Sequence, residues 1–364
     1  MKILYDHQAF TMQDFGGVSK IYAETSKYLR DYSDVKLSYP WMISNNDYIY
    51  DDKIIGAWTP SKEIKFKGKG TLLVYLRKLN QSFSKQAIRK GDFDIFHPTY
   101  YNPYYLKQKI RKPTVVTCYD LIHEKFKQSE VELLAWKKQV LLNSTKIIAI
   151  SEHTKLDLID YYGIPSEKIG VSLLGSSFDL IPSQPDYDGP PFFLYVGHRD
   201  GYKNFRLFIK AISPLLRSQK NLFLYSAGAR PFIKDELALF DELEISGKIR
   251  HFGGSNAILT LLYSQAIAFF CPSLYEGFGI PLLEAMSCRC PVVTSNQSSL
   301  PEVAGDAAIY FDPSDEESIL KAAELVLYDA GLRKEIIDKG IQRLGLFSWE
   351  KTARSTYDIY KSLV

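Results

Sequence analysis

The 364-residue sequence lacks long apolar runs, and it contains few cysteines. No stretch reaches the ~18 consecutive apolar residues that a membrane-spanning helix requires. The first residues, Met1–Asp6, lead directly into a strand-like segment without the pattern of a signal peptide. We therefore expect a cytoplasmic protein with no integral membrane segment.

Signatures of bound metals, dinucleotides and nucleic acids are also missing. The four cysteines (Cys118, Cys271, Cys288, Cys290) are not spaced like a zinc site, so reduced structural thiols are expected. The acidic pair Asp51–Asp52 does not follow a strand, and no G-x-G-x-x-G follows one either. A net charge of +3 is too small to indicate nucleic-acid binding. We expect no metal, no cofactor and no nucleic-acid partner.

The chain is long enough for two domains that each bury a core. Short apolar runs alternate with helical patterns, which favours an α/β protein with parallel sheets. Strands are predicted near residues 3–5, 94–96, 114–117 and 147–150, and again near 192–196, 222–226, 249–252, 266–271 and 291–294. A Pro- and Asp-rich segment, 177–191, separates the two sets and indicates a linker.

The segment Glu276–Glu284 (EGFGIPLLE) lies between two of these strand-like runs. Pro281 suits the first position of a helix, which leaves the amides around Gly279 and Ile280 directed at a ligand. Such a helix end attracts phosphate. Glu276 precedes the helix and Glu284 lies about one turn inside it. Each could instead be an ordinary charge, Glu276 in a solvated loop and Glu284 favoured by the helix dipole.

The spacing Glu, seven residues, Glu, with Gly277–Gly279 (GFG) between them and 300–308 (LPEVAGDAA) after them, resembles the retaining glycosyltransferases of family 4. The resemblance implies the GT-B fold, in which two Rossmann-like, doubly wound domains face each other across a cleft. It implies an acceptor-side domain at 1–183, joined by a C-terminal helix within 347–364, and a nucleotide-sugar domain at 190–346. The implied reaction is transfer of a hexose, with retention, from a nucleotide-diphosphate sugar to a hydroxyl of a glycan or lipid-linked acceptor.

The resemblance also assigns residues. Glu276 would contact the sugar and Glu284 the ribose, while Gly277, Phe278, Gly279 and Ile280 would line the donor. Arg199 and Lys203, in 197–204 (GHRDGYKN), match a basic pair that would bind the donor diphosphate and stabilise the leaving group. Gly16–Gly17 would allow close approach to the donor, unless this pair is only a flexible loop.

Residues 117–124 (TCYDLIHE) form a third segment of the resemblance. Tyr119 stands where many family members have a histidine, whereas Asp120 is retained. His123, one turn further on, could contact sugar or acceptor, or serve only a structural role. Ser151 resembles a serine at a family helix start, and a helix N-cap is the simpler interpretation.

The stretch Trp58–Lys90 has nine basic residues, one acidic residue and interleaved apolar side chains. It is either a solvated helix face or a patch for the anionic inner face of a membrane. Segments 195–199 (YVGHR) and 119–123 (YDLIH) resemble enzymes of surface-polysaccharide or O-antigen assembly. This resemblance makes GDP-mannose a donor to test. The alternatives are a GT-B nucleotide-sugar epimerase, a phosphorylase, for which no pyridoxal lysine segment is evident, and a nucleotide-binding module without catalysis.

Overall fold

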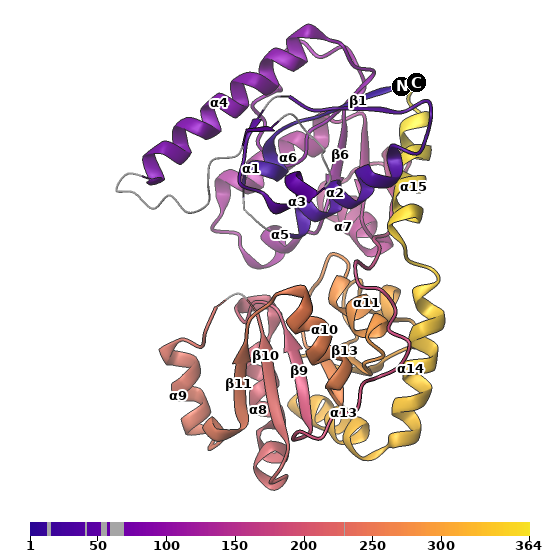
Figure 1. Cartoon of the computed structure of the whole chain (residues 1–364). Coiled ribbons are helices and arrows are strands. Elements are labelled where there is room, and N and C mark those ends of the chain that lie inside the picture. The colour runs from indigo at the N-terminus through magenta and orange to yellow at the C-terminus, as the bar shows by residue number, and fades with distance from the viewer. Residues whose placement is uncertain (13–15, 41, 52–56, 59–68, 229) are drawn as a thin grey trace. The chain divides into compact units, whose positions relative to one another are not determined.

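The computed structural model describes residues 1–12, 16–40, 42–51, 57–58, 69–228 and 230–364. The chain forms two compact units (Figure 1). The first comprises Met1–Leu174 together with Trp349–Val364, and the second comprises Gly175–Ser348. The boundaries predicted from the sequence were 183 and 190, inside the segment that leads to the second sheet.

The first unit is built on parallel strands. One sheet has the order β2-β1-β5 and another has the order β6-β7-β8, and a parallel bridge between Phe96 and Thr114 connects β5 to the start of β6. A separate parallel pair joins β3 to β4. The strands are β1 (Lys2–Tyr5), β2 (Lys36–Ser38), β3 (Met42–Ile43), β4 (Ala57–Trp58), β5 (Ile95–His97), β6 (Val115–Cys118), β7 (Lys146–Ala149) and β8 (Ile169–Val171).

Helices lie between most of these strands, as is usual for parallel pairing. They are α1 (Gln8–Thr11), α2 (Gly17–Leu29), α3 (Asp47–Asp51), α4 (Lys69–Lys90), α5 (Ile122–Phe126), α6 (Val131–Asn143), α7 (Glu152–Tyr162) and the 3₁₀ turn η1 (Ser166–Lys168). The ends of α7 follow from its sequence. The Ser151 hydroxyl accepts the Thr154 amide at 3.0 Å, which confirms the N-cap reading. Gly163 ends the helix with φ 64°, where a glycine carries no steric penalty.

The C-terminal helix α15 (Trp349–Lys361) packs against α2 of the first unit (Figure 1). The Tyr360 hydroxyl lies 2.6 Å from His97 Nδ1 and 3.0 Å from the Tyr5 hydroxyl. The Thr352 hydroxyl donates to the Leu173 carbonyl at 2.7 Å. Burial lowers the pKa of His97 to about 3. This buried network therefore holds a neutral histidine at the junction of β5 and α15.

The second unit has one six-stranded parallel sheet with the order β11-β10-β9-β12-β13-β14. Its strands are β9 (Phe192–Val196), β10 (Phe223–Ala227), β11 (Ile249–Phe252), β12 (Ala268–Cys271), β13 (Val292–Ser295) and β14 (Ile309–Phe311). The helices are η2 (Gly201–Lys203), α8 (Phe205–Ser218), α9 (Lys234–Glu242), η3 (Ser246–Lys248), α10 (Asn256–Gln265), α11 (Ile280–Ser287), α12 (Leu300–Ala304), α13 (Glu316–Tyr328) and α14 (Ala330–Leu344). The buried faces of α8 and α13 pack on the sheet and form much of its core.

Each strand predicted from an apolar run is present, with ends shifted by at most two residues. The prediction missed β2, β3, β4, β8 and β14, none of which exceeds three residues. All four cysteines are buried and free. Burial raises the pKa of the Cys271 thiol to about 11, which matches a structural thiol. Among the described residues, no helix is both long enough and apolar enough to cross a bilayer.

Candidate active site in the second unit

The strand order of the second sheet marks where a ligand is expected. From β9 the chain adds β10 and β11 on one side, and it then returns to add β12 on the other side of β9. In open parallel sheets a crevice forms at such a reversal, beyond the carboxyl ends of the two strands. The loop after β9 carries Lys203 and the loop after β12 carries Glu276. Two residues predicted for the site therefore lie on adjacent loops.

These two side chains form an ion pair. Lys203 Nζ lies 2.6 Å from Glu276 Oε1, and the same carboxylate oxygen accepts the Ser273 hydroxyl at 2.6 Å. The side chains keep 19% and 14% of their surface exposed, so a ligand can reach them. Burial by itself lowers the pKa of Lys203, but the Glu276 carboxylate more than offsets this and the pKa lies above its ordinary value. Lys203 is therefore a fixed cation.

Hydrogen bonds to main-chain carbonyls fix the positions of the two loops relative to each other. The Leu274 amide donates to the Tyr202 carbonyl at 2.8 Å. The Ser299 hydroxyl, at the start of α12, donates to the carbonyls of Glu276 and Phe278 at 2.8 and 3.0 Å. The position of Glu276 is thus set by three segments, which limits its reorganisation when a ligand binds.

Helix α11 begins at this site. Gly279 precedes its first residue with φ 104°, a conformation that favours glycine, and a Cβ there would lie 3.0 Å from a Leu300 methyl carbon. Pro281 lies in the first turn, one residue later than the predicted first position. The first amides of a helix carry partial positive charge, although in α11 Pro281 has no N–H and the Leu282 amide donates to the Gly279 carbonyl at 3.0 Å. This end of α11 suits an anion.

The other predicted donor-binding residues differ in exposure. Phe278 is only 3% exposed, and its ring packs edge-on against Phe347 with centroids 5.8 Å apart, so it supports the loop from within. Gly277 and Ile280 flank it on the same turn. Glu284 is 8% exposed, in the second turn of α11, and is therefore not a solvated first-turn acid. Burial and, next, the Glu284 charge raise the pKa of the neighbouring Tyr263.

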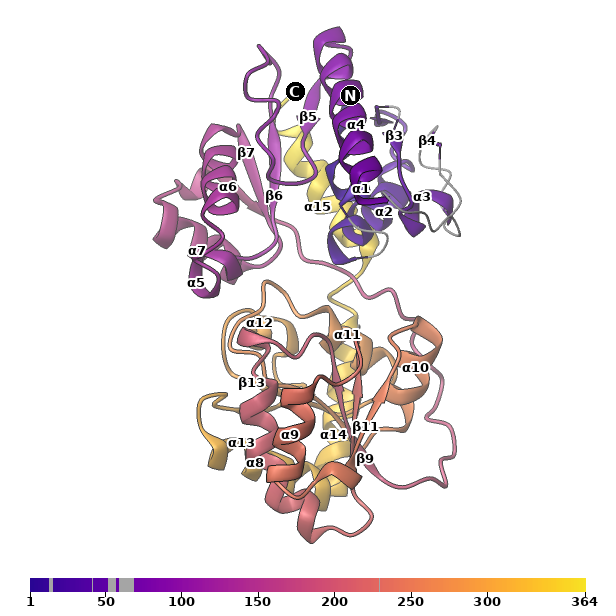
Figure 2. The ribbon, with the colours of Figure 1, turned by 90° about the vertical axis from the view of Figure 1, so that its left-hand side faces the viewer.

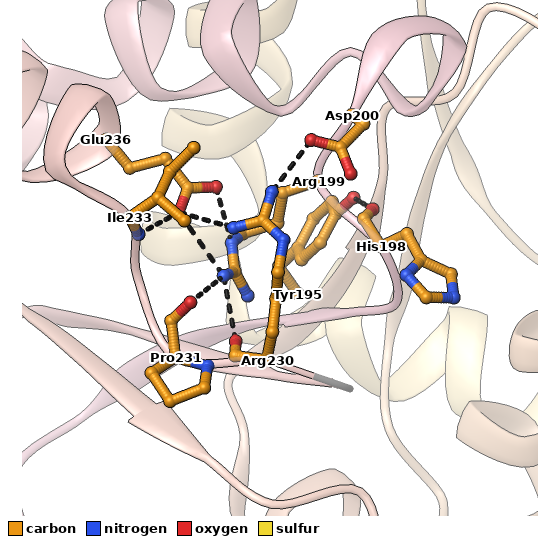
Figure 3. Close-up of polar contacts among 8 residues, drawn as sticks. All are labelled: Tyr195, His198, Arg199, Asp200, Arg230, Pro231, Ile233 and Glu236. Carbon is orange, nitrogen blue, oxygen red and sulfur yellow. Dashed lines mark hydrogen bonds and ion pairs between the residues drawn. The ribbon is translucent and has the colours of Figure 1, made fainter. Parts of the chain in front are cut away.

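Arg199 does not have the surroundings that the prediction required (Figure 3). Its side chain is 1% exposed, and its Nε donates to Glu236 Oε1 at 2.8 Å. One terminal nitrogen donates to the carbonyls of Arg230 and Pro231, each at 2.9 Å. The guanidinium also lies over the Phe232 ring, 4.8 Å from its centroid. The prediction treated Arg199 as an accessible cation that binds the diphosphate. In the structure its side chain instead joins two loops.

Glu236 and Arg230 complete this cluster, and sequence reasoning missed both. Arg230 contacts Glu236 at 3.1 Å and Asp200 at 2.7 Å, with a third of its side chain exposed (Figure 3). Burial raises the pKa of Glu236, but hydrogen bonds from Arg199 and the Ile233 amide lower it more, so the carboxylate is charged. Glu236 is the third residue of α9, and a first-turn acid after Pro231 was the available signal.

Asp120 and His123, two of the site residues predicted in the first unit, follow β6. Asp120 Oδ1 accepts the Ile122 amide at 3.0 Å, and the Asp120 carbonyl accepts Lys137 Nζ. His123 Nε2 lies 3.5 Å from a Glu130 carboxylate oxygen, with 19% of the side chain exposed. Tyr119 is buried. Its hydroxyl donates to the Tyr22 hydroxyl and the Thr99 carbonyl at 2.9 and 3.1 Å, so it belongs to the core of this unit.

Comparisons with known proteins assign the family. The sequence profile of glycosyl transferases group 1 matches residues 177–343, and that of glycosyltransferase family 4 matches residues 62–172. O-antigen chain mannosyltransferase B of Escherichia coli is 31% identical over 327 residues, which are 82% of this chain and 85% of that relative. The chain belongs to the glycosyl transferases group 1.

Other relatives match this chain over a smaller part of their own length or at lower sequence identity. Serotype-specific mannosyltransferase WbdA of Escherichia coli is 29% identical over 69% of this chain, and the match spans 34% of WbdA. The chain thus covers about a third of that relative's length. The Anabaena protein HepE, solved in complex with UDP and glucose, aligns over all of this chain and 99% of its own with a TM-score of 0.75 at 14% identity. The predictions of the family, the GT-B fold and a hexosyltransferase are confirmed.

In this glycosyltransferase Gly16 and Gly17 lie at the start of α2, directly after residues outside the described part of the chain. Gly16 is extended at φ 170°, and a Cβ added to Gly17 would meet nothing within 4 Å. Neither observation requires glycine here, and close approach to a donor stays a prediction. The charged stretch Trp58–Lys90 falls partly on residues 59–68, which lie outside the described residues.

Proposed function

We propose that this enzyme transfers a mannosyl group from a nucleotide-diphosphate sugar, with GDP-mannose as the first donor to test, to a hydroxyl of a glycan or lipid-linked acceptor. The observation that carries the proposal is the Lys203–Glu276 pair beside the start of α11, at the reversal point of the second sheet. The names of the curated relatives support mannose and O-antigen assembly.

The chemistry follows from charge. When the bond between sugar C1 and the diphosphate oxygen breaks, negative charge grows on the leaving group. Lys203 and the first amides of α11 are fixed positive groups that would stabilise this charge, and such preorganised stabilisation is often the largest catalytic contribution. A diphosphate that takes over Lys203 would leave the Glu276 carboxylate to accept hydrogen bonds from the sugar.

We further propose retention of configuration. The acceptor oxygen would bond to C1 on the face that the diphosphate leaves, and the acceptor proton would pass to a leaving phosphate oxygen. This route needs no protein nucleophile, and it leaves Glu276, which accepts a hydrogen bond from Ser273, to bind the sugar hydroxyls. Charge stabilisation by Lys203 and α11 is also the basis for expecting activity without a metal ion.

The experiment is a donor and acceptor panel. GDP-mannose, UDP-glucose and ADP-glucose are each incubated with mannose-terminated acceptors, and free nucleoside diphosphate and the product anomer are measured with and without EDTA. Acceptor-dependent release of GDP, with an α-linked product and no effect of EDTA, is expected. Conversion of the donor sugar to an epimer without acceptor would indicate the epimerase alternative, whereas release of the unchanged sugar is only donor hydrolysis. Donor binding without release under any acceptor would indicate a binding module.

Membrane association forms a separate part of the proposal. On α4 the side chains of Tyr75 and Leu79 are 62% and 46% exposed and lie one helical turn apart, and Lys85 and Lys90 lie further along the same helix. We propose that this helix contributes to reversible binding to an anionic surface. Sedimentation with phosphatidylglycerol and phosphatidylcholine vesicles tests it, because only the anionic vesicles should bind and salt should release them. Retention of binding by a Tyr75→Ser/Leu79→Ser variant would exclude α4.

A further inference from the structure

The first unit contains a pocket at the reversal point of its own sheet. β1 pairs with β2 on one side and with β5 on the other, so the order of the strands reverses at β1. The segments that follow β1 and β5 line a cavity of about 510 Å³, together with α4 and α6. This volume is typical of small-molecule sites, which span roughly 300–1,000 Å³. Position and size both indicate a ligand site that the donor chemistry does not use.

The wall formed by the segments after β1 and β5 is polar, and its side chains are hydrogen-bonded to one another. The buried Asp6 accepts hydrogen bonds from the amide and hydroxyl of Thr99 at 2.9 and 2.7 Å, from Gln8 Nε2 at 2.8 Å and from the Tyr104 hydroxyl at 3.0 Å. Gln8 Oε1 in turn accepts the Asn102 amide at 2.8 Å. Gln8, Asn102 and Tyr104 all line the cavity, and their orientations are set by a carboxylate behind them.

This wall retains donors for a ligand. Asn102 Oδ1 accepts the Tyr104 amide at 3.1 Å, and the described residues contain no partner for its Nδ2. His7 Nδ1 lies 2.7 Å from the Ser84 hydroxyl, which places α4 against α1 (Figure 2). Burial lowers the pKa of His7, although Asp6 opposes this shift. A neutral imidazole and a fixed amide are suited to the hydroxyl groups of a sugar.

The cavity lining also includes aromatic rings and cations. Trp136 of α6 and Tyr100 line the cavity, and rings of this kind can cover the apolar face of a sugar. Arg77 and Lys78 of α4 line it as well, and neither has an ion-pair partner within the described ranges. Within the described part of the chain, no acidic side chain lines the cavity, so the charged lining residues are the two cations Arg77 and Lys78.

We infer that this pocket binds the acceptor, and that the acceptor is a glycan bearing a phosphate or diphosphate group, with a sugar ring against Trp136 and the anion against Arg77 and Lys78. Arg can bind phosphate oxygens through two parallel hydrogen bonds, and Lys adds a point charge. A diphosphate-linked lipid glycan and a free sugar phosphate both present this chemistry. The identification of this ligand as the acceptor rests on the proposed function.

Binding of mannose 1-phosphate and of methyl α-D-mannopyranoside tests the inference by calorimetry, in saturating GDP so that the donor site is occupied. Wild-type enzyme should bind the phosphorylated sugar at least tenfold more tightly. Arg77→Gln/Lys78→Gln should lose this preference, and Trp136→Ala should weaken both ligands. The matched control Lys107→Gln/Lys109→Gln removes the same charge from an exposed segment of the first unit outside the cavity, and it should behave as wild type.

Equal binding of the two sugars by the wild type, or a preference that survives Arg77→Gln/Lys78→Gln, would overturn the inference. Because the titration requires no turnover, its failure is distinct from failure of the proposed transfer, which the donor panel decides. If the wild type prefers the phosphorylated sugar, binding of a polyprenyl diphosphate mannose in detergent then shows whether the natural ligand is lipid-linked or soluble. Tighter binding than mannose 1-phosphate indicates a lipid-linked acceptor and equal binding a soluble one, and both agree with the inference.

Discussion

Lys203 Nζ and Glu276 Oε1 lie 2.6 Å apart although 73 residues separate them in the chain. The contact exists because β9 and β12, which precede the two residues, are neighbours in the sheet. Without a ligand each side chain neutralises the other. A bound diphosphate sugar would supply the lysine with an anion and the carboxylate with hydroxyl groups, so the pair would separate into two functional groups.

Replacing either member of the pair should impair catalysis in different ways. Lys203→Gln should lower kcat by about two decades, because a fixed positive group facing the leaving diphosphate is lost. Glu276→Gln should lower kcat by about one to two decades through weaker hydrogen bonds to the sugar. Steady-state kinetics with circular dichroism as a check on folding measure both effects. Wild-type kinetics in both variants would refute this site.

Arg199→Ala should act through stability, since it leaves Glu236 buried beside Arg230 alone. Removing one partner of a buried ion pair costs about 3 kcal/mol. For a domain the size of the second unit, this corresponds to a fall in Tm of roughly 6–12 °C. Arg230→Ala removes the more exposed partner and serves as the control, with a smaller fall. If Arg199→Ala keeps its Tm and loses activity, the residue contacts the diphosphate directly.

Glu284→Ala should weaken donor binding more than it slows turnover. A carboxylate that is 8% exposed, one turn inside α11, can accept hydrogen bonds from a ribose near the start of that helix. Loss of such bonds costs about 1.5–3 kcal/mol, or one to two decades in donor KM. Glu302→Ala, on the neighbouring helix α12, is a control for loss of charge. An unchanged KM in Glu284→Ala would remove this residue from the donor site.

His97 should make the first unit sensitive to acid. Its pKa is lowered to about 3 by burial, so the unfolded chain binds a proton between about pH 6.5 and 3 that the folded chain does not. Uptake of this proton by the unfolded chain lowers the free energy of unfolding as the pH falls below 6.5. The loss is about 2 kcal/mol at pH 5. Urea unfolding at pH 7 and pH 5 measures the loss.

A His97→Gln variant isolates this effect. It should be less stable than wild type at pH 7, because the bonds to Tyr360, Tyr22 and Thr117 are disturbed. Its loss of stability between pH 7 and 5 should be smaller by about 2 kcal/mol. His7, whose pKa is also lowered, titrates in both proteins and cancels in the comparison. Identical pH dependence in the two proteins would show that His97 is not the titrating group.

Local features could be predicted because their causes are local. A run of apolar residues such as 192–196 is buried on both faces of a parallel sheet wherever it lies, and nine such strands were predicted correctly. Gly279 and Pro281 together indicate the start of α11, and Ser151 indicates the start of α7. The sequence by itself also determined the family, because the pattern from Glu276 to Glu284 combines several rare features over a short distance.

The tertiary structure alone decided which charges are available. Arg199 and Lys203 lie four residues apart in one loop, and nothing local distinguishes them. Burial does, since Arg199 meets Glu236, 37 residues away, whereas Lys203 faces the partly exposed Glu276. Strands as short as β14 gain their pairing from neighbours and carry too few residues for a pattern. The pocket of the first unit likewise depends on which strands are adjacent, because Gln8, Arg77, Asn102 and Trp136 come from four separate segments.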